Sequence, residues 1–241
     1  MTGSELSREA RAELRTSPKA KAETVARHLV MAGRLIDDEP QVAYEHAVAA
    51  RRLLPRLASV REAVGLCAYA IGEWAEALGE LRASRRINGS VEHLPVMADC
   101  ERGLGRPERA LALALGPDAK KLDRAGAVEM RIVVAGARRD LGQPDAAVVS
   151  LQGADLDQRK RDPWSARLFY AYADALLAAG RGAQAREWFV AAAVADVDGA
   201  TDAVDRVDEI DSARQETDSA PAAGPPAQTE LMLVFEEPPD A

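Results

Sequence analysis

The side chains best suited to metal binding or nucleophilic catalysis are few and widely spaced in this sequence. The two cysteines are Cys67 and Cys100, and the three histidines are His28, His46 and His93. No CxxC, HxxxH or HExxH spacing joins them, so neither a zinc site nor a metalloprotease motif is indicated. Packed helix axes lie about 8–10 Å apart, whereas a disulfide needs Cα atoms within about 7 Å. We therefore expect two buried, unpaired thiols.

Two glycine-rich stretches also fail to match a phosphate-binding loop. GRGAQA (180–185) lacks the Lys-Ser/Thr pair of a P-loop, and both it and GLGRPE (103–108) follow a helical pattern rather than a strand. The GxSxG nucleophile motif is absent from the sequence as well. We therefore predict no catalytic residue, no cofactor and no metal site, and a protein that is not an enzyme.

The composition favours an all-α fold. The chain is 47% hydrophobic but only 4% aromatic, and much of the apolar content is alanine, which has the best helix propensity. No apolar run approaches the roughly 20 residues that span a bilayer. The N-terminus, MTGSELSREARAELR, is charged and has no apolar signal core. We expect a cytoplasmic protein without membrane contact.

A repeated unit supplies the scaffold. Turn glycines recur at Gly72, Gly105, Gly142 and Gly180, with separations of 33, 37 and 38 residues. A small residue stands seven positions before each glycine, and an alanine stands five positions after it. Small residues let two helices approach closely, and a glycine that ends the first helix adopts a left-handed cap. The positions predicted to carry this packing are Gly65, Gly72, Ala77, Gly105, Ala110, Gly142, Ala147, Ala173, Gly180 and Ala185.

This pattern resembles the tetratricopeptide repeat, whose period is about 34 residues. The unit AVGLCAYAIGEWAEALGELRAS (63–84) is the most similar, and residues 166–192 are nearly as close. Phrases such as ARHLVMAGRLIDDEP and DPWSARLFYAYADALLAAGR are also similar to a group of actinobacterial tetratricopeptide-like proteins. The resemblance implies an all-α, right-handed solenoid of helical hairpins with about five helix pairs.

The chain divides into four regions. We predict a polar N-terminal segment at 1–18, a tetratricopeptide-like domain at 19–195, a capping helix at 196–211 and a disordered acidic tail at 212–241. Residues 196–241 hold 13 acids and 2 bases, a net charge of −11, whereas the whole chain carries −8. The tail also contains the apolar cluster LMLVF (231–235). Two interpretations of the tail stay open: it folds back onto a basic groove, or it only keeps the protein soluble.

In tetratricopeptide arrays the first helices of successive units line a concave face that binds partners. When positions are counted from each turn glycine, the resemblance implies a face that bears Tyr69, Asp99, Arg102, Arg139, Asp140, Arg167, Tyr170 and Asp174, with Glu62, Leu66, Glu129 and Ile132 beside them. Two interpretations of its arginines stay open. They either form a basic stripe that binds carboxylates, or each pairs with a neighbouring Asp or Glu.

A second set of arginines is Arg51, Arg52, Arg56 and Arg61, with Arg82, Arg85 and Arg86 nearby in sequence; RRLLPRL (51–57) and RASRRI (82–87) lie at the ends of second helices. The helix dipole favours cations at these ends, and such cations can also contact RNA phosphates. We predict a non-enzymatic scaffold or adaptor that binds a protein or peptide on the concave face. The alternatives are an RNA- or ribosome-associated adaptor that uses these arginines, and a regulatory subunit of an enzyme.

One helix start is marked by the sequence DPW at 162–164. Asp162 is the predicted N-cap and Pro163 the first helical residue, since both types are favoured there. Trp164 is then interpreted as a packing residue between two units, with a binding anchor as the alternative.

Overall fold

The computed structural model describes residues 5–219, and within this range the chain forms helices and no strand. The all-α prediction is confirmed. The helices are α1 (Arg8–Leu14), α2 (Lys19–Leu35), α3 (Pro40–Leu53), α4 (Ala58–Ala70), α5 (Trp74–Asn88), α6 (Leu94–Gly103), α7 (Pro107–Leu115), the 3-10 helix η1 (Pro117–Lys121), α8 (Arg124–Asp140), α9 (Pro144–Leu151), α10 (Ser165–Ala178), α11 (Gly182–Ala195) and α12 (Ala203–Ser219).

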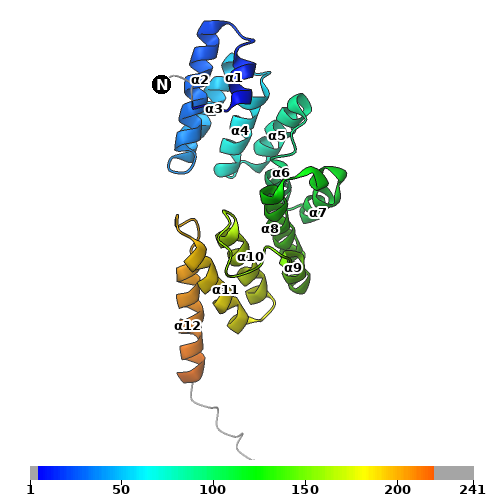
Figure 1. The fold of residues 1–241 in the computed structure, drawn as a ribbon, viewed down its shortest axis with the longest axis vertical. Helices are drawn as coiled ribbons and strands as arrows, with labels where there is room; N and C mark the ends of the chain where they lie inside the picture. Colours follow the sequence, from blue (N-terminus) through cyan, green and yellow to red (C-terminus); the bar gives the residue numbers. More distant parts are fainter. Residues whose placement is uncertain (1–4, 220–241) are drawn as a thin grey trace, which may run out of the picture.

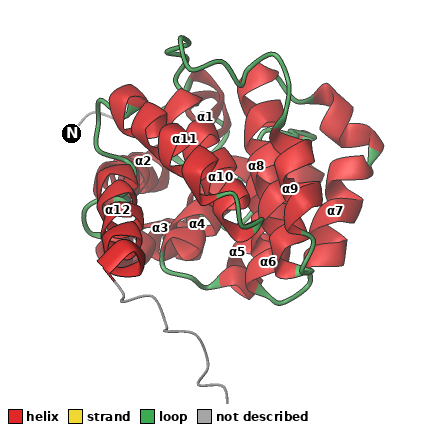
Figure 2. Cartoon of the chain, turned by 90° about the horizontal axis from the view of Figure 1, so that it is seen from below, coloured by secondary structure: helices red, strands yellow, loops and turns green. Residues whose placement is uncertain are grey.

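Each helix packs on its neighbour in sequence. The most extensive contacts join α2 to α3, α4 to α5 and α10 to α11, while further contacts link α2 to α4, α6 to α8 and α8 to α10. The helices follow an arc, with α1–α3 at one end, α6–α9 in the middle and α10–α12 at the other end (Figure 1). Seen along the long axis, α7 lies at the rim while α8 and α10 lie nearer the middle (Figure 2).

Four turns have the same hydrogen-bonded geometry. Gly72, Gly105, Gly142 and Gly180 have φ angles of 78°, 69°, 69° and 74°. At the first turn, Gly72 donates its N–H to the Tyr69 carbonyl at 3.0 Å, and Glu73 donates to the Ala68 carbonyl at 2.9 Å. The equivalent pairs of bonds recur after α6, α8 and α10. This Schellman arrangement satisfies the last carbonyls of each helix and requires the left-handed residue that glycine supplies.

Small residues lie where the helices are closest. A Cβ atom built on Gly65 of α4 would lie 2.7 Å from Leu81 Cγ of α5, so even a methyl group does not fit there. The alanines predicted at the equivalent contact are almost completely buried: Ala77, Ala110, Ala147, Ala173 and Ala185 are each 0 or 1% exposed. These alanines, together with Gly65, lie in the core where helices of one hairpin meet.

The start of α10 differs from the prediction. The helix begins at Ser165 rather than at Asp162 or Pro163, because the backbone N–H of Ser165 bonds to the Asp162 carbonyl and closes a turn first. Trp164 packs against the core cluster of α8–α11, and the Arg124 guanidinium lies 5.6 Å from its ring centroid. Trp164 therefore has a packing position between units.

The C-terminal helix is longer than expected and begins later. We predicted a capping helix at 196–211, whereas α12 runs from Ala203 to Ser219 and takes up part of the region predicted to be disordered. Ala203 is 1% exposed, and Val207 and Ile210 pack on the core beside it. Residues 196–202 instead form a turn in which Asp196 accepts bonds from the backbone of residues 200 and 201. The rest of the predicted tail, with LMLVF, lies outside the described residues.

The N-terminal segment is attached to the body through α1. Ala10 and Leu14 of α1 are buried, and α1 contacts both α2 and α4. The Glu13 carboxylate accepts bonds from the backbone N–H and the hydroxyl of Ser59, at 3.0 and 2.7 Å, in the first turn of α4. Because this carboxylate meets the positive end of the helix dipole, it both caps α4 and holds α1 in place.

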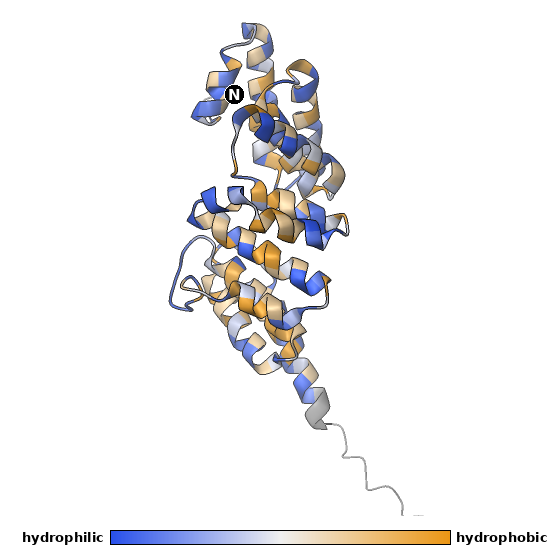
Figure 3. Cartoon of the chain, turned by 90° about the vertical axis from the view of Figure 1, so that its right-hand side faces the viewer, coloured by the Kyte–Doolittle hydropathy of each residue, from blue (hydrophilic) through white to orange (hydrophobic). Residues whose placement is uncertain are grey.

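Apolar and polar residues alternate along the described helices, and none is apolar along its whole length (Figure 3). Within the part of the chain that the structure describes, no helix combines the length and the apolar character that crossing a membrane requires.

Candidate partner-binding face

The eight residues predicted to line a binding face lie together on four successive first helices. We call this surface the first-helix face. Tyr69 lies on α4, Asp99 and Arg102 on α6, Arg139 and Asp140 on α8, and Arg167, Tyr170 and Asp174 on α10. Polar contacts connect them from one helix to the next.

One half of the face is a chain of four side chains across α4, α6 and α8. The Tyr69 hydroxyl donates to Asp99 at 2.6 Å, and Arg102 donates to the other Asp99 oxygen at 2.7 Å. Arg102 also donates its Nε–H to Asp140 at 2.8 Å. Burial, followed by the bond to Asp99, raises the pKa of Tyr69 well above its ordinary value of 10. This tyrosine therefore remains a hydrogen-bond donor throughout the neutral range.

The sequence did not reveal why Arg102 lies flat against α8. A Cβ atom built on Gly136 would lie 2.5 Å from the guanidinium carbon of Arg102. Gly136 is buried in α8 and leaves the space that the guanidinium fills. The glycine sits inside a helical run rather than at a turn, so its partner could be found only from the structure.

The other half of the face is centred on Asp174. Its carboxylate accepts a bond from Arg139 of α8 and lies 3.6 Å from Arg206 of α12. The Arg206 guanidinium also lies 5.2 Å from the ring centroid of Phe189. Burial, with the nearby Arg102 charge, lowers the pKa of Arg139 below its ordinary value. Sequence analysis missed Arg206, since it lies in a strongly acidic stretch.

The arginines of the face are paired rather than open. Arg167 lies 2.9 Å from Glu129, and the pKa of that glutamate is raised because burial outweighs the arginine charge. With Arg102 between Asp99 and Asp140 and Arg139 on Asp174, the face is a ladder of alternating charges. Of the two interpretations of these arginines, pairing with neighbouring acids is the one observed.

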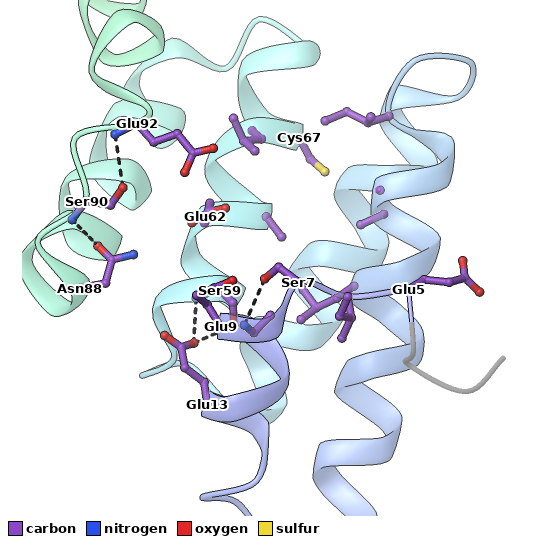
Figure 4. A pocket seen from close by; sticks show the side chains of 18 residues that line it. Glu5, Ser7, Glu9, Glu13, Ser59, Glu62, Cys67, Asn88, Ser90 and Glu92 are labelled. Carbon is purple, nitrogen blue, oxygen red and sulfur yellow. Dashed lines mark hydrogen bonds between the residues drawn. The ribbon is translucent and has the colours of Figure 1, made fainter. Parts of the chain in front are cut away.

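A cavity of about 650 Å³ lies on the same side, between α1, α2, α4 and the connection from α5 to α6. Two residues expected beside the face, Glu62 and Leu66, line it, and so does Cys67 (Figure 4). The α1 wall was not predicted, because nothing in its sequence specifies which helix it contacts. We call this cavity the α1–α4 pocket.

Four of the seven arginines of the second set are also paired with acids. Arg51 bonds to Glu76 and Glu80 at 2.7 Å, and Arg61 bonds to Glu80 at 2.8 Å. Arg82 donates to Glu101 at 2.6 Å; this carboxylate side chain is only 1% exposed. The ion pairs of these arginines therefore connect helices α3, α4, α5 and α6. Arg85 pairs in the same way with Asp118.

Two histidines that are distant in sequence meet between α2 and α3. The Nδ1 atoms of His28 and His46 are 2.9 Å apart, a distance at which the N–H of one ring donates a hydrogen bond to the nitrogen of the other. Burial, followed by the charges of His46 and Arg27, lowers the pKa of His28 below 6.5. Their separation of 18 residues spans a helical hairpin, which is why a search for short metal spacings did not find them.

The cysteines are free and buried, as predicted. Burial raises the pKa of Cys67 to about 11 and that of Cys100 to about 12, so neither thiol is a good nucleophile at neutral pH. In the described part of the chain, no group of three or more His, Cys, Asp or Glu side chains is arranged to hold a metal ion. The first-helix face itself presents hydrogen-bonding groups and ion pairs.

A scan against protein-family models and a search of curated proteins each returned no match for this chain. The functional argument therefore rests on the geometry of the first-helix face and of the α1–α4 pocket.

Proposed function

We propose that this chain is a tetratricopeptide-like solenoid of about five helical hairpins that binds a protein or peptide partner on the first-helix face. In this proposal the protein is a scaffold or adaptor and catalyses no reaction. The observation that carries the proposal is the polar ladder that runs from Tyr69 to Asp174 across four first helices. The repeated Schellman turns support a repeat architecture, since the same turn joins the two helices of each of four successive hairpins.

The ladder suits recognition of a polypeptide. Half-buried carboxylates and guanidinium groups in alternation can exchange their internal partners for those of a ligand, and the bidentate fork of arginine favours carboxylates. Tyr69 and Tyr170 add two half-buried aromatic side chains at positions near the two ends of the ladder. Tyrosine and arginine are the residue types in which binding energy at protein interfaces is concentrated.

An RNA-binding function has less support. RNA binding relies on unpaired cations for phosphates and on aromatic rings for stacking. Here four of the seven arginines of the second set, Arg51, Arg61, Arg82 and Arg85, already bond to acids of the same chain. A regulatory subunit of an enzyme would use the same partner-binding face, so it is a particular case of the proposal.

The test is site-specific photo-crosslinking. Benzoylphenylalanine replaces Tyr69 or Tyr170 on first helices in one pair of variants, and Ile87 of α5 or Val149 of α9 in a control pair. The control side chains are 51% and 64% exposed, so they are accessible to any surface contact. We expect one protein adduct, resistant to nuclease, from the first pair only. Adducts formed only from the control pair, or adducts lost on nuclease treatment, would contradict the proposal.

A further inference from the structure

The α1–α4 pocket has an apolar floor made by α2 and α4. Leu29 and Ala32 of α2 lie on one side, and Leu66 and Cys67 of α4 lie on the other. Its volume of about 650 Å³ lies within the range of roughly 300–1,000 Å³ in which ligand sites fall. It is large enough to receive more than one aliphatic side chain.

The rim of the pocket carries a single sign of charge. Glu5, Glu9, Glu13, Glu62 and Glu92 all line it, and none of the described residues that line it is a Lys or an Arg. Figure 4 shows Glu92 on the connection between α5 and α6 and Glu62 on α4. A low-dielectric floor beneath like charges strengthens the field at the mouth of the pocket. The pocket is therefore complementary to a ligand that is both apolar and cationic.

Three of these carboxylates hold the pocket in shape. Glu13 bonds to Ser59 at the start of α4, Glu5 pairs with Arg34 at 2.8 Å, and Glu62 lies 3.2 Å from His93. Glu9 and Glu92 differ from them: both are exposed, and neither forms an ion pair within the described side chains. Two carboxylates thus remain available for a ligand in a pocket that is already formed.

The charge of the chain indicates which of three polypeptides can bind in the pocket: its own C-terminal segment, a second copy or another protein. Residues 196–241 hold 13 acids and only 2 bases, so this segment has the same sign as the rim and is repelled by it. A second copy of this chain carries a net charge of −8, so it too has the same sign as the rim. A cationic segment from another protein meets neither obstacle.

We infer that the α1–α4 pocket binds a cationic amphipathic helix of the partner protein, with one or two aliphatic side chains on the floor and Lys or Arg at Glu9 and Glu92. This inference rests on the proposed function, since it names the chemistry of the partner. An amphipathic helix inserted in a groove is a common mode of peptide recognition, in which apolar anchors three or four residues apart give affinity. The surrounding charges set the orientation and the salt dependence.

The test uses the full-length protein and a fluorescein-labelled 14-residue peptide of Leu and Lys at helical spacing. Its matched control has Glu in place of every Lys. Fluorescence anisotropy is measured for wild type, for the pocket variant Glu9→Gln/Glu92→Gln, and for a control variant Glu45→Gln/Glu187→Gln. Glu45 and Glu187 are exposed residues of α3 and α11, so the two variants change net charge equally. A third variant, Leu66→Ala, tests the apolar floor, and circular dichroism confirms that each variant is folded.

We expect the cationic peptide to bind wild type and the control variant with the same affinity, within twofold. Its affinity should fall at least fivefold for the pocket variant and at least threefold for Leu66→Ala, and raising the salt concentration should weaken binding to wild type. Equal weakening by the two double variants, or equal binding of the Glu peptide, would overturn the inference. In that event a protein adduct at Tyr69 or Tyr170 would still support the proposed function, so the two failures are distinguishable.

Discussion

Gly65 shows how much of this fold depends on the size of single residues. Its backbone lies against Leu81, and the built Cβ atom would lie 2.7 Å from Leu81 Cγ and 3.2 Å from its backbone nitrogen. The side chain could turn aside, but the backbone nitrogen belongs to α5 and moves only if the helix moves. Residue size at this position therefore sets the distance between α4 and α5.

We predict that Gly65→Ala lowers the free energy of unfolding by about 1–3 kcal/mol, the usual cost of overpacking a core. Gly79→Ala is the matched control, because Gly79 is an exposed residue of α5 with no atom within 4 Å of its built Cβ. The control should gain up to about 1 kcal/mol from helix propensity. Urea unfolding followed by circular dichroism gives both values. If Gly65→Ala left the free energy of unfolding unchanged, the close contact between α4 and α5 would be disproved.

The histidines predict two opposite effects of pH. The pKa of His28 is lowered by burial and by the charges of His46 and Arg27, so its contribution to stability is lost as pH falls below about 6.5, the unfolded value. Burial also lowers the pKa of His93, but its bond to Glu62 outweighs this, and the net pKa is raised. The contribution of His93 is complete below the unfolded value and is lost as pH rises through the folded pKa.

Unfolding midpoints in urea at pH 7.5 and 5.5 test both signs. Relative to wild type, His28→Gln should lose less stability on acidification, whereas His93→Gln should lose more. The same change in both variants would mean that the His28–His46 contact or the His93–Glu62 contact does not persist in solution.

At the scale of elements, α12 covers the end of the core. Ala203, its first residue, is 1% exposed, and Arg186 of α11 forms two bonds to Asp211 at 2.5 and 2.6 Å. We predict that Ala203→Glu lowers the free energy of unfolding by about 1–3 kcal/mol, because a charge is then buried without a partner. Val204→Glu is the control: Val204 is the next residue of α12 and is 61% exposed.

Both substitutions place a carboxylate in the first turn of α12, so any gain from the helix dipole cancels between them. Thermal unfolding should show a lower midpoint for Ala203→Glu than for Val204→Glu. Equal midpoints would show that α12 is not docked on the core.

The sequence predicted the elements whose causes are local. A turn glycine and a proline two residues later determine where one helix ends and the next begins, and α7 and α9 do begin at Pro107 and Pro144. The start of α10 was misplaced, because a turn closed by Ser165 competes with the Asp-Pro signal. The docking of α1, the His28–His46 contact and the role of Arg206 depend on distant partners, and no local pattern encodes them.

Across the whole molecule, the polar ladder joins helices that are far apart in sequence. Arg102 links Asp99 of its own helix to Asp140, which lies 38 residues further on. Its side chain is 24% exposed, and it fills the space over Gly136. Neighbouring units are therefore coupled through the same residues that are proposed to bind a partner.

We predict that Arg102→Ala lowers the free energy of unfolding by about 1–3 kcal/mol, because it leaves two carboxylates without their cation and removes packing. Arg159→Ala is the control, since Arg159 is 91% exposed and pairs only with nearby Asp157. The control should leave the free energy of unfolding nearly unchanged, because an exposed ion pair contributes little to stability. Chemical unfolding of both variants gives the comparison, and equal effects would show that the ladder does not couple the units.

Hydrogen–deuterium exchange on the purified complex with the cross-linked partner tests the central claim most directly. It reports, peptide by peptide, which helices the partner protects. We predict slower exchange on binding in α4, α6, α8 and α10, with little change in α5, α7, α9 and α11. Protection confined to the second set of helices would contradict partner binding on the first-helix face.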